Sequence, residues 1–191
     1  MATQTLLTVE QFLDLPDQEG VFRELDEGAV IEMTWASPDQ MTWASPDHGL
    51  IQSNAVTLLK IWSRERRAEF VVSQSTAFQL GPDTVRVADV FVARTSSYRA
   101  MPVVRGVVQG CPDLALEVVS KNDTAIDIDR KVRQYLQAGA VAVWLTYSET
   151  RHVLAYRRPG EIRTYEAGQT IEEPELIPGL AIPVDELFEG I

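Results

Sequence analysis

The run LALEVVSKNDTAIDIDRKVRQYLQAGAVAVWLTY, residues 114–147, decides the fold of this chain. Its opening LALEVVS is strongly apolar and has the length of a buried strand. A helix is predicted to begin at Asp123 or Thr124 and to end at Gly139, because glycine is favoured just past a helix terminus. VAVWLTY is a second apolar run. The stretch therefore predicts a strand, a helix and a strand in succession.

The segments on either side continue this mixture of strands and helices. A capping box from Thr8 to Gln11 predicts a short helix at 8–15. Hydrophobic periodicity predicts a hairpin at 21–33, a helix at 46–66, and strands at 70–80, 85–93, 152–158 and 161–167. Residues 95–111 are predicted to form a loop. The tail is predicted to wrap the surface and to end in a short helix at 184–188.

Length and composition predict one domain over residues 1–191, with enough apolar material for a sizeable core. Cys111 is the single cysteine and cannot form an internal disulfide. The N-terminal residues show no signal peptide, and no apolar run reaches the roughly 18 residues of a membrane span. We therefore expect a cytoplasmic protein without a membrane partner. The net charge of −11 disfavours nonspecific nucleic-acid binding. It does not exclude a nuclease, because binding depends on local charge.

A tandem repeat interrupts the chain before the predicted helix at 46–66. MTWASPDQ at 33–40 is followed at once by MTWASPDH at 41–48, so seven of eight residues recur. A period seen only twice is not a solenoid. Its proline and aspartate residues favour turns, and insertions into surface loops cost little free energy. The repeat is therefore predicted to be a loop.

Two carboxylates lie within otherwise apolar strand patterns. Asp89 is in VRVADVFVA, and Glu117 is in LALEVVS, where it shares a face with Ala115 and Val119. A buried carboxylate needs a partner, and two acids directed at one point repel each other unless a cation joins them. Mg²⁺ takes one or two carboxylates with water and phosphate oxygens. The two acids could share a metal ion, or each could pair with an arginine or cap a neighbouring element.

A lysine follows these acids on the predicted helix. Lys131 flanks the apolar stripe formed by Val132 and Tyr135, so its ammonium could reach the end of the preceding strand. There it could orient a water molecule or stabilise a phosphate. The alternative is a surface lysine that pairs with Asp127, four residues earlier.

Other polar residues are weaker candidates for the site. Glu24 lies in the first hairpin and by itself is an ordinary strand acid. His48 stands at a helix start, where it could touch phosphate or a metal-bound water, or simply act as a polar cap. Lys60, Arg64 and Arg67 share one helix face, which could contact a DNA backbone or be solvated.

Several site classes are excluded by their missing signatures. One cysteine and two distant histidines cannot build a structural zinc site. The chain has no P-loop and no G-x-G-x-x-G fingerprint. It also lacks the G-x-S-x-G elbow of a serine hydrolase.

The ordered set of motifs resembles the Uma2 family of the PD-(D/E)xK nuclease superfamily. The motifs are RELDEG, SPDH at a helix start, VRVADV, PDLALEVVS, and D-x-x-x-K-x-x-x-Y-x-x-A-G-A-x-x-V-W. The resemblance spans roughly residues 8–180. The resemblance implies an α/β (α+β) fold with a restriction-endonuclease-like core, in which a mixed β-sheet is flanked by helices.

The resemblance also assigns roles to residues of this chain. Asp89 stands at the PD aspartate, preceded by Ala88 where proline is usual. Glu117 stands at the acidic position of the (D/E)xK strand, and Val119 occupies the usual lysine position. The family places that lysine on the next helix, which matches Lys131.

Two further residues match the family pattern. Glu24 matches the acid of the first hairpin, and His48 matches the histidine at the helix start. The implied catalytic set is Asp89, Glu117, Lys131, Glu24 and His48, and the implied metal ligands are Asp89, Glu117 and Val118. The implied cofactor is Mg²⁺ or Mn²⁺. The implied function is an endonuclease that hydrolyses DNA as a homodimer or higher homo-oligomer, and the alternative is an inactive nuclease-fold binding or regulatory module.

Overall fold

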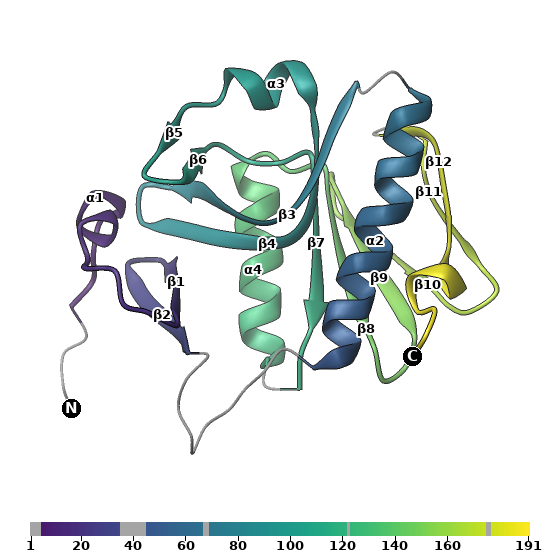
Figure 1. The fold of residues 1–191 in the computed structure, drawn as a ribbon, viewed down its shortest axis with the longest axis horizontal. Helices are drawn as coiled ribbons and strands as arrows, with labels where there is room; N and C mark the ends of the chain where they lie inside the picture. Colours follow the sequence, from purple (N-terminus) through teal and green to yellow (C-terminus); the bar gives the residue numbers. More distant parts are fainter. Residues whose placement is uncertain (1–4, 35–44, 67–68, 122, 175–176) are drawn as a thin grey trace.

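A computed structural model describes residues 5–34, 45–66, 69–121, 123–174 and 177–191 (Figure 1). Within these ranges the helices are α1 (Val9–Leu13), α2 (Pro46–Glu65), α3 (Thr95–Ala100), α4 (Ala125–Ala138) and α5 (Val184–Leu187). The strands of the main sheet are β1 (Val21–Asp26), β2 (Ala29–Thr34), β3 (Phe70–Gly81), β4 (Thr84–Arg94), β5 (Val103–Val104), β6 (Val107–Gln109), β7 (Leu114–Val119), β8 (Ala142–Tyr147), β9 (His152–Arg157) and β10 (Glu161–Tyr165). A separate pair comprises β11 (Thr170–Glu173) and β12 (Ile177–Pro183).

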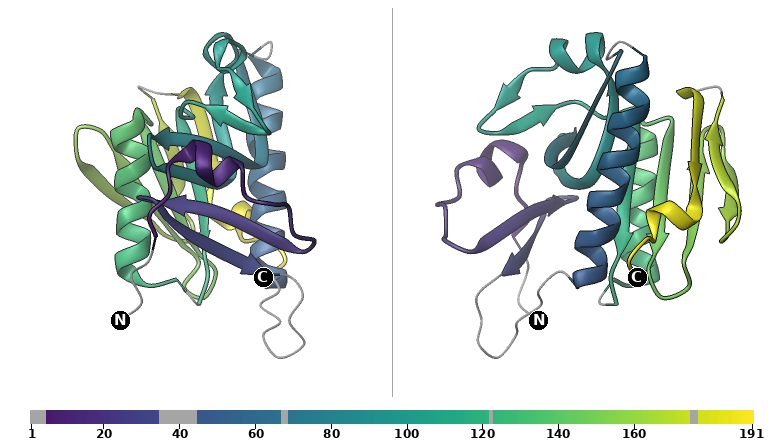
Figure 2. Two further views of the ribbon diagram at one scale, coloured as in Figure 1. Left: turned by 90° about the vertical axis from the view of Figure 1, so that its left-hand side faces the viewer. Right: turned by 45° about the vertical axis from the view of Figure 1, so that its right-hand side comes forward.

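The main sheet is mixed and has helices on both faces. Its strand order is β10-β9-β8-β7-β4-β3-β6-β5, and the β1–β2 hairpin joins it through β4. β7 and β8 are parallel and connected by α4, whereas β4 runs antiparallel to β7. α2 packs against one face and α4 against the other (Figures 1 and 2). The predicted mixed sheet flanked by helices is therefore confirmed.

Alternation along β7 supplies both halves of the core. Leu114, Leu116 and Val118 pack with the buried residues of α2, while Ala115 packs with those of α4. The strand is buried on both faces, as expected for a central strand covered by helices. Glu117 therefore lies on the α4 face, as the alternation predicted.

Local capping signals fix the helix starts. The Thr8 and Gln11 capping box precedes α1 as predicted. Ser45 caps α2 through the backbone N–H of His48, and Thr124 caps α4. α4 ends at Gly139, whose φ of 122° suits glycine.

The β3–β4 pair changes faces part-way along its length. Val72 of β3 and Val90 of β4 pack with the α2-side core, whereas Phe78 of β3 packs on the α4 side. Val72 and Phe78 are six residues apart on β3, so a regular strand would place both side chains on one face. The change occurs at Ser75, whose φ is 48°. Beyond it, the pair curves away from β7 toward the β1–β2 hairpin (Figure 1).

Two predictions about irregular segments were wrong. Residues 95–111 hold α3, β5 and β6 rather than a plain loop. β6 pairs with the distant β3, and β5 pairs with β6, which local periodicity does not reveal. The tail does not simply wrap the surface, because β11 and β12 bury Ile171 and Ile182 in the α2-side core. The short final helix is confirmed.

The tandem repeat lies mostly outside the described residues. Its first two residues end β2, and its last four, from Ser45, form the cap and first turn of α2. The loop prediction, made for the whole repeat at 33–48, is therefore wrong at these two ends, and for 35–44, which lie outside the described residues, it stays a prediction. Among the helices in the described ranges, none is long and apolar enough to cross a membrane.

Candidate functional site

Asp89 and Glu117 lie where β4 and β7 separate. The antiparallel pairing of these strands ends at Val90 opposite Leu116, and Asp89 and Glu117 are the next residues along each strand. The Asp89 carboxylate occupies the fork, where its Oδ2 accepts the backbone N–H of Val118 at 2.8 Å. The C-terminal end of β7 and the N-terminal ends of α2 and α4 meet at this edge of the molecule (Figure 1).

His48 of α2 contacts the Asp89 carboxylate. Its Nε2 lies 3.3 Å from Asp89 Oδ1, and both side chains are about one-fifth exposed. The hydrogen bond with Asp89 raises the pKa of His48, burial opposes that rise, and the charge of Glu117 supports it. The structure thus brings His48 to the acid pair rather than leaving it as a simple polar cap.

Lys131 of α4 pairs with the site and not with Asp127. Its Nζ lies 2.8 Å from Glu117 Oε2 and 3.5 Å from Glu24 Oε1. Burial lowers the pKa of Lys131, but the charges of Glu117 and Glu24 outweigh it, so the net pKa is raised. The lysine is therefore a cation at neutral pH, and its side chain is 25% exposed, which leaves it a route to solvent.

Glu117 is buried with one oxygen unsatisfied. Among the described residues, Glu117 Oε1 and the nearby Tyr135 hydroxyl are buried side-chain atoms that complete no hydrogen bond. Burial raises the pKa of Glu117 to about 7; Lys131 opposes this rise, and the charges of Asp89 and Glu24 add to it. The carboxylate thus has less positive charge around it than full ionisation requires.

A buried charge cluster fixes Glu24 beside Lys131. Arg86 is 3% exposed and donates to Glu24 Oε2 at 2.9 Å, while Glu24 Oε1 accepts the Val87 backbone N–H at 2.8 Å. The same guanidinium lies 2.6 Å from Asp26 Oδ1 and donates to Gln134 at 2.7 Å. The sequence reasoning missed this cluster. A signal was present, because Arg86 is a charged residue inside an apolar strand pattern.

The five predicted catalytic residues therefore come together from five elements of the chain. β1 brings Glu24, α2 brings His48, β4 and β7 bring the acid pair, and α4 brings Lys131. Their catalytic roles stay predictions. The geometry shows three acids gathered with a lysine and a histidine.

Comparisons with known proteins fit this arrangement. The model of the Uma2 family, described as "Putative restriction endonuclease", matches residues 9–185. The chain belongs to the Uma2 family. The solved structure of "a putative nuclease belonging to DUF820 from Anabaena variabilis ATCC 29413" has a TM-score of 0.77 and 22% identity to this Uma2 chain. It covers 95% of this chain and 97% of its own, and at this identity it shows a shared fold. No curated protein matches the chain.

The metal implied by a nuclease family can be tested against these residues. In the described parts of the chain, no three His, Cys, Asp or Glu side chains form a ready ligand cluster. Asp89 and Glu117 fit a smaller donor set, because they are adjacent at the fork and Glu117 Oε1 lacks a donor. Mg²⁺ suits one or two carboxylates, with water and phosphate completing its shell. Val118 gives its N–H to Asp89, and its role as a metal ligand stays a prediction.

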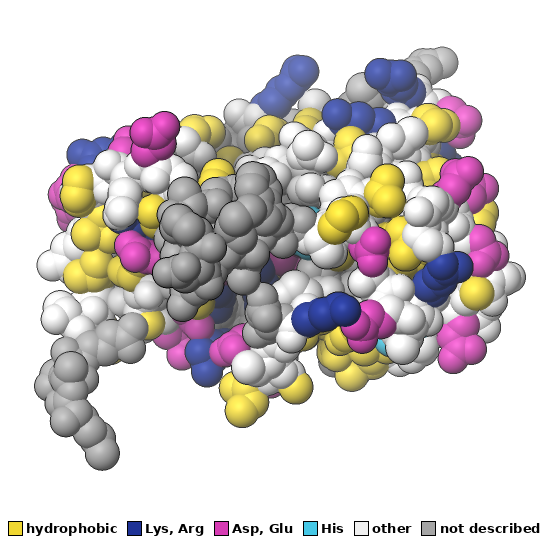
Figure 3. Space-filling view, turned by 60° about the horizontal axis from the view of Figure 1, so that its bottom comes forward, with side chains coloured by type: hydrophobic (Ala, Val, Ile, Leu, Met, Phe, Trp, Pro, Cys, Tyr) yellow, Lys and Arg dark blue, Asp and Glu magenta, His cyan; other side chains and the backbone are white. Residues whose placement is uncertain are grey.

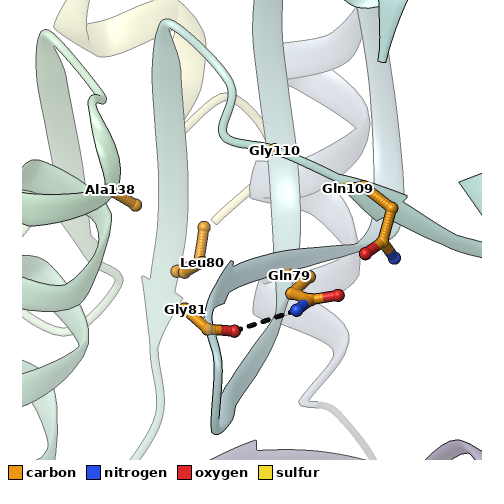
Figure 4. A pocket seen from close by; sticks show the side chains of 6 residues that line it. All are labelled: Gln79, Leu80, Gly81, Gln109, Gly110 and Ala138. Carbon is orange, nitrogen blue, oxygen red and sulfur yellow. Dashed lines mark hydrogen bonds between the residues drawn. The ribbon is translucent and has the colours of Figure 1, made fainter. Parts of the chain in front are cut away.

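Two pockets in the described part of the Uma2 protein lie away from the acid pair. One pocket of about 300 Å³ is lined by Gln79, Leu80, Gly81, Gln109, Gly110 and Ala138 (Figure 4). None of these lining residues can titrate, and the Gln79 amide is bonded to the Gly81 carbonyl at 3.1 Å. A second pocket of about 500 Å³ adjoins Arg151 and His152. Neither of these two pockets is lined by Asp89 or Glu117.

The raised pKa of Glu117 predicts that the metal-free protein loses stability as pH rises. The carboxyl has an ordinary pKa of 4.5 and a folded pKa of about 7. Its protonation therefore stabilises the fold fully below 4.5, and this stability is lost as pH rises through 7. We expect the Tm in EDTA, measured by calorimetry, to fall from about pH 5 to about pH 8.

A matched variant separates Glu117 from His48, whose raised pKa has the same sign. Glu117→Gln should flatten the fall in Tm, because the amide does not titrate. A Glu117→Gln profile as steep as that of the wild type would contradict the assignment.

Proposed function

We propose that this Uma2 protein is a Mg²⁺-dependent endonuclease that hydrolyses DNA phosphodiester bonds. The observation that supports it most directly is the pairing of Lys131 with Glu117 at the fork beside Asp89. Two carboxylates with a neighbouring ammonium provide the charges that phosphoryl transfer requires. The lysine reaches this place from α4, because Val119 occupies the strand position that would otherwise carry it.

Each residue of the proposed site has a distinct role. Asp89 and Glu117 would hold the cation, which when bound lowers the pKa of a water ligand and offsets phosphate charge. The Lys131 ammonium binds the non-bridging phosphate oxygens and stabilises their growing charge. Glu24 is fixed by Arg86 and is the second acid, beside Glu117, that holds the Lys131 ammonium in place. His48 holds Asp89 Oδ1, so the second oxygen of that carboxylate stays on Val118.

The direct test is an incubation with plasmid, linear duplex and single-stranded DNA in Mg²⁺ or Mn²⁺, with EDTA as the control. Cleavage that needs the metal supports the endonuclease. Metal binding by calorimetry without cleavage of any DNA form would instead favour the nuclease-fold binding module, which the net charge of −11 also suits. We also propose that the protein is cytoplasmic. We propose further that it acts as a homodimer, because cutting both strands of a duplex needs two sites.

The basic residues on α2 give a separate prediction about DNA affinity. Basic and acidic side chains are mixed over the face shown in Figure 3, so DNA binding must rely on particular cations. Lys60 and Arg64 are exposed on one face of α2, and Arg67 lies outside the described residues. Replacing Lys60 and Arg64 with Gln should weaken DNA binding and lower the slope of log K against log salt by about one per lost contact.

Fluorescence anisotropy at several salt concentrations measures this slope. Arg133→Gln is the control, because Arg133 is 62% exposed and already pairs with Asp129. An unchanged slope in the α2 variant would mean that Lys60 and Arg64 are only solvated.

A further inference from the structure

The β3–β4 ladder is interrupted opposite Asp89. Gln74 pairs with Val90 and Thr76 pairs with Ala88 in the same register, but Ser75 and Asp89, which lie opposite each other between them, are not paired. Ser75 has a φ of 48°, a left-handed conformation that is uncommon for a residue with a side chain. Backbone irregularities of this kind often aim a side chain beside a functional site.

A side chain from α2 spans this interruption. The amide of Gln52 donates to the backbone carbonyl of Asp89 at 2.8 Å and to the hydroxyl of Ser75 at 3.2 Å. Gln52 therefore ties the irregular residue of β3 to the acid of β4. None of the family motifs in the sequence includes it.

We infer that Gln52 is a positioning residue that sets the direction of the Asp89 carboxylate. The inference rests on the proposed function, because it concerns the same metal site. His48 and Gln52 are four residues apart and share one face of α2. His48 holds the carboxylate at Oδ1, and Gln52 holds the backbone of the same residue. The first two turns of α2 thus contact Asp89 at its carboxylate and at its backbone carbonyl.

These two contacts matter because Asp89 lies where β4 and β7 separate. Asp89 is not paired with Ser75 across the ladder, and its backbone carbonyl accepts a hydrogen bond from the Gln52 side chain of α2 instead. The backbone orientation at Asp89 decides whether its carboxylate reaches Val118 and the fork. Partners that orient a metal ligand in this way typically account for 10- to 100-fold in metal affinity.

The test is Mn²⁺ titration by calorimetry on the full chain. Gln52→Leu replaces the amide with an apolar group and removes both hydrogen bonds, so we expect Mn²⁺ to bind about 10- to 100-fold more weakly. Asn54→Leu is the matched control. Asn54 also lies on α2 and donates its amide to two backbone carbonyls, those of Leu187 and Glu189, away from the site. Its Mn²⁺ affinity should equal that of the wild type.

Ser75 supplies a second pair of variants on an exposed position of β3. Ser75→Gly accepts a positive φ and should keep the Mn²⁺ affinity within about threefold of the wild type. Ser75→Val resists that φ, because a β-branched side chain is strained there, so it should weaken Mn²⁺ binding as Gln52→Leu does.

The outcomes separate the inference from the proposed function. A wild type that binds no Mn²⁺ overturns both. A wild type that binds Mn²⁺, with Gln52→Leu binding equally well, overturns only the role of Gln52. Equal losses of affinity in Gln52→Leu and Asn54→Leu would also overturn it, because they would reflect general loosening of α2. If Gln52→Leu does not fold, Gln52→Met decides, because methionine keeps the length of glutamine without its amide.

Discussion

Lys131→Ala is expected to keep the fold and the metal site while losing most DNA cleavage. The ammonium lies 2.8 Å from Glu117 and is held there by α4, whose stripe of Val132 and Tyr135 is buried. Losing one preorganised donor to a developing charge costs about 100- to 1,000-fold in rate. We therefore expect a drop of that size in kcat for plasmid cleavage, with Mn²⁺ affinity at pH 8 nearly unchanged.

Lys121→Ala is the matched control for this variant. Lys121 is closer in sequence to the β7 strand, but its side chain is 80% exposed and pairs with Glu149. Its removal should leave cleavage unchanged. If Lys121→Ala abolishes cleavage and Lys131→Ala does not, the assignment of the lysine to α4 is wrong.

Asp89→Asn is expected to abolish measurable metal binding. The amide keeps the size of the carboxylate and can still accept the Val118 N–H, so the fold should remain intact. It removes one of two charges that a cation would bridge, and a hard cation prefers charged oxygen ligands. We expect a loss of at least about 100-fold in Mn²⁺ affinity by calorimetry, and no cleavage.

Asp113→Asn tests whether the loss is specific. The Asp113 carboxylate also accepts a backbone N–H across β4 and β7, that of Arg94 at 2.7 Å, at the other end of the same strand pair. The bond is similar, but the location is not the fork. Wild-type affinity in Asp113→Asn, with lost affinity in Asp89→Asn, is the expected pattern. Intact affinity in Asp89→Asn would contradict the proposed site.

Hydrophobic periodicity predicted the elements whose burial is set locally. LALEVVS alternates so regularly that the face of Glu117 followed from the sequence, and the caps at Thr8 and Gly139 marked helix ends correctly. The resemblance to the Uma2 family added what periodicity could not. It grouped Glu24, His48 and Lys131 with the acid pair before any contact between them was visible.

The missed features all depend on contacts between distant segments. β6 exists because it pairs with β3, and the tail is buried because Ile171 meets the core beside α2. Ser75 carries no sequence signal for a left-handed backbone, since serine adopts ordinary strand geometry elsewhere. From the sequence alone, Gln52 is an ordinary polar residue of an amphipathic helix, and its contact with β4 is visible only in the tertiary structure. These features require the tertiary structure, so local propensity does not predict them.

The order in which the site residues are synthesised also has a consequence. A growing chain exposes Glu24 first, then His48, Asp89 and Glu117, and it exposes Lys131 last. Until α4 emerges and β8 pairs with β7, the site carboxylates repel one another and lack the Lys131 ammonium that offsets their charge. Because domains generally fold as units during synthesis, a ribosome-bound fragment ending before α4 would hold no complete site. The proposed cleavage activity would thus be absent until most of the polypeptide has been translated.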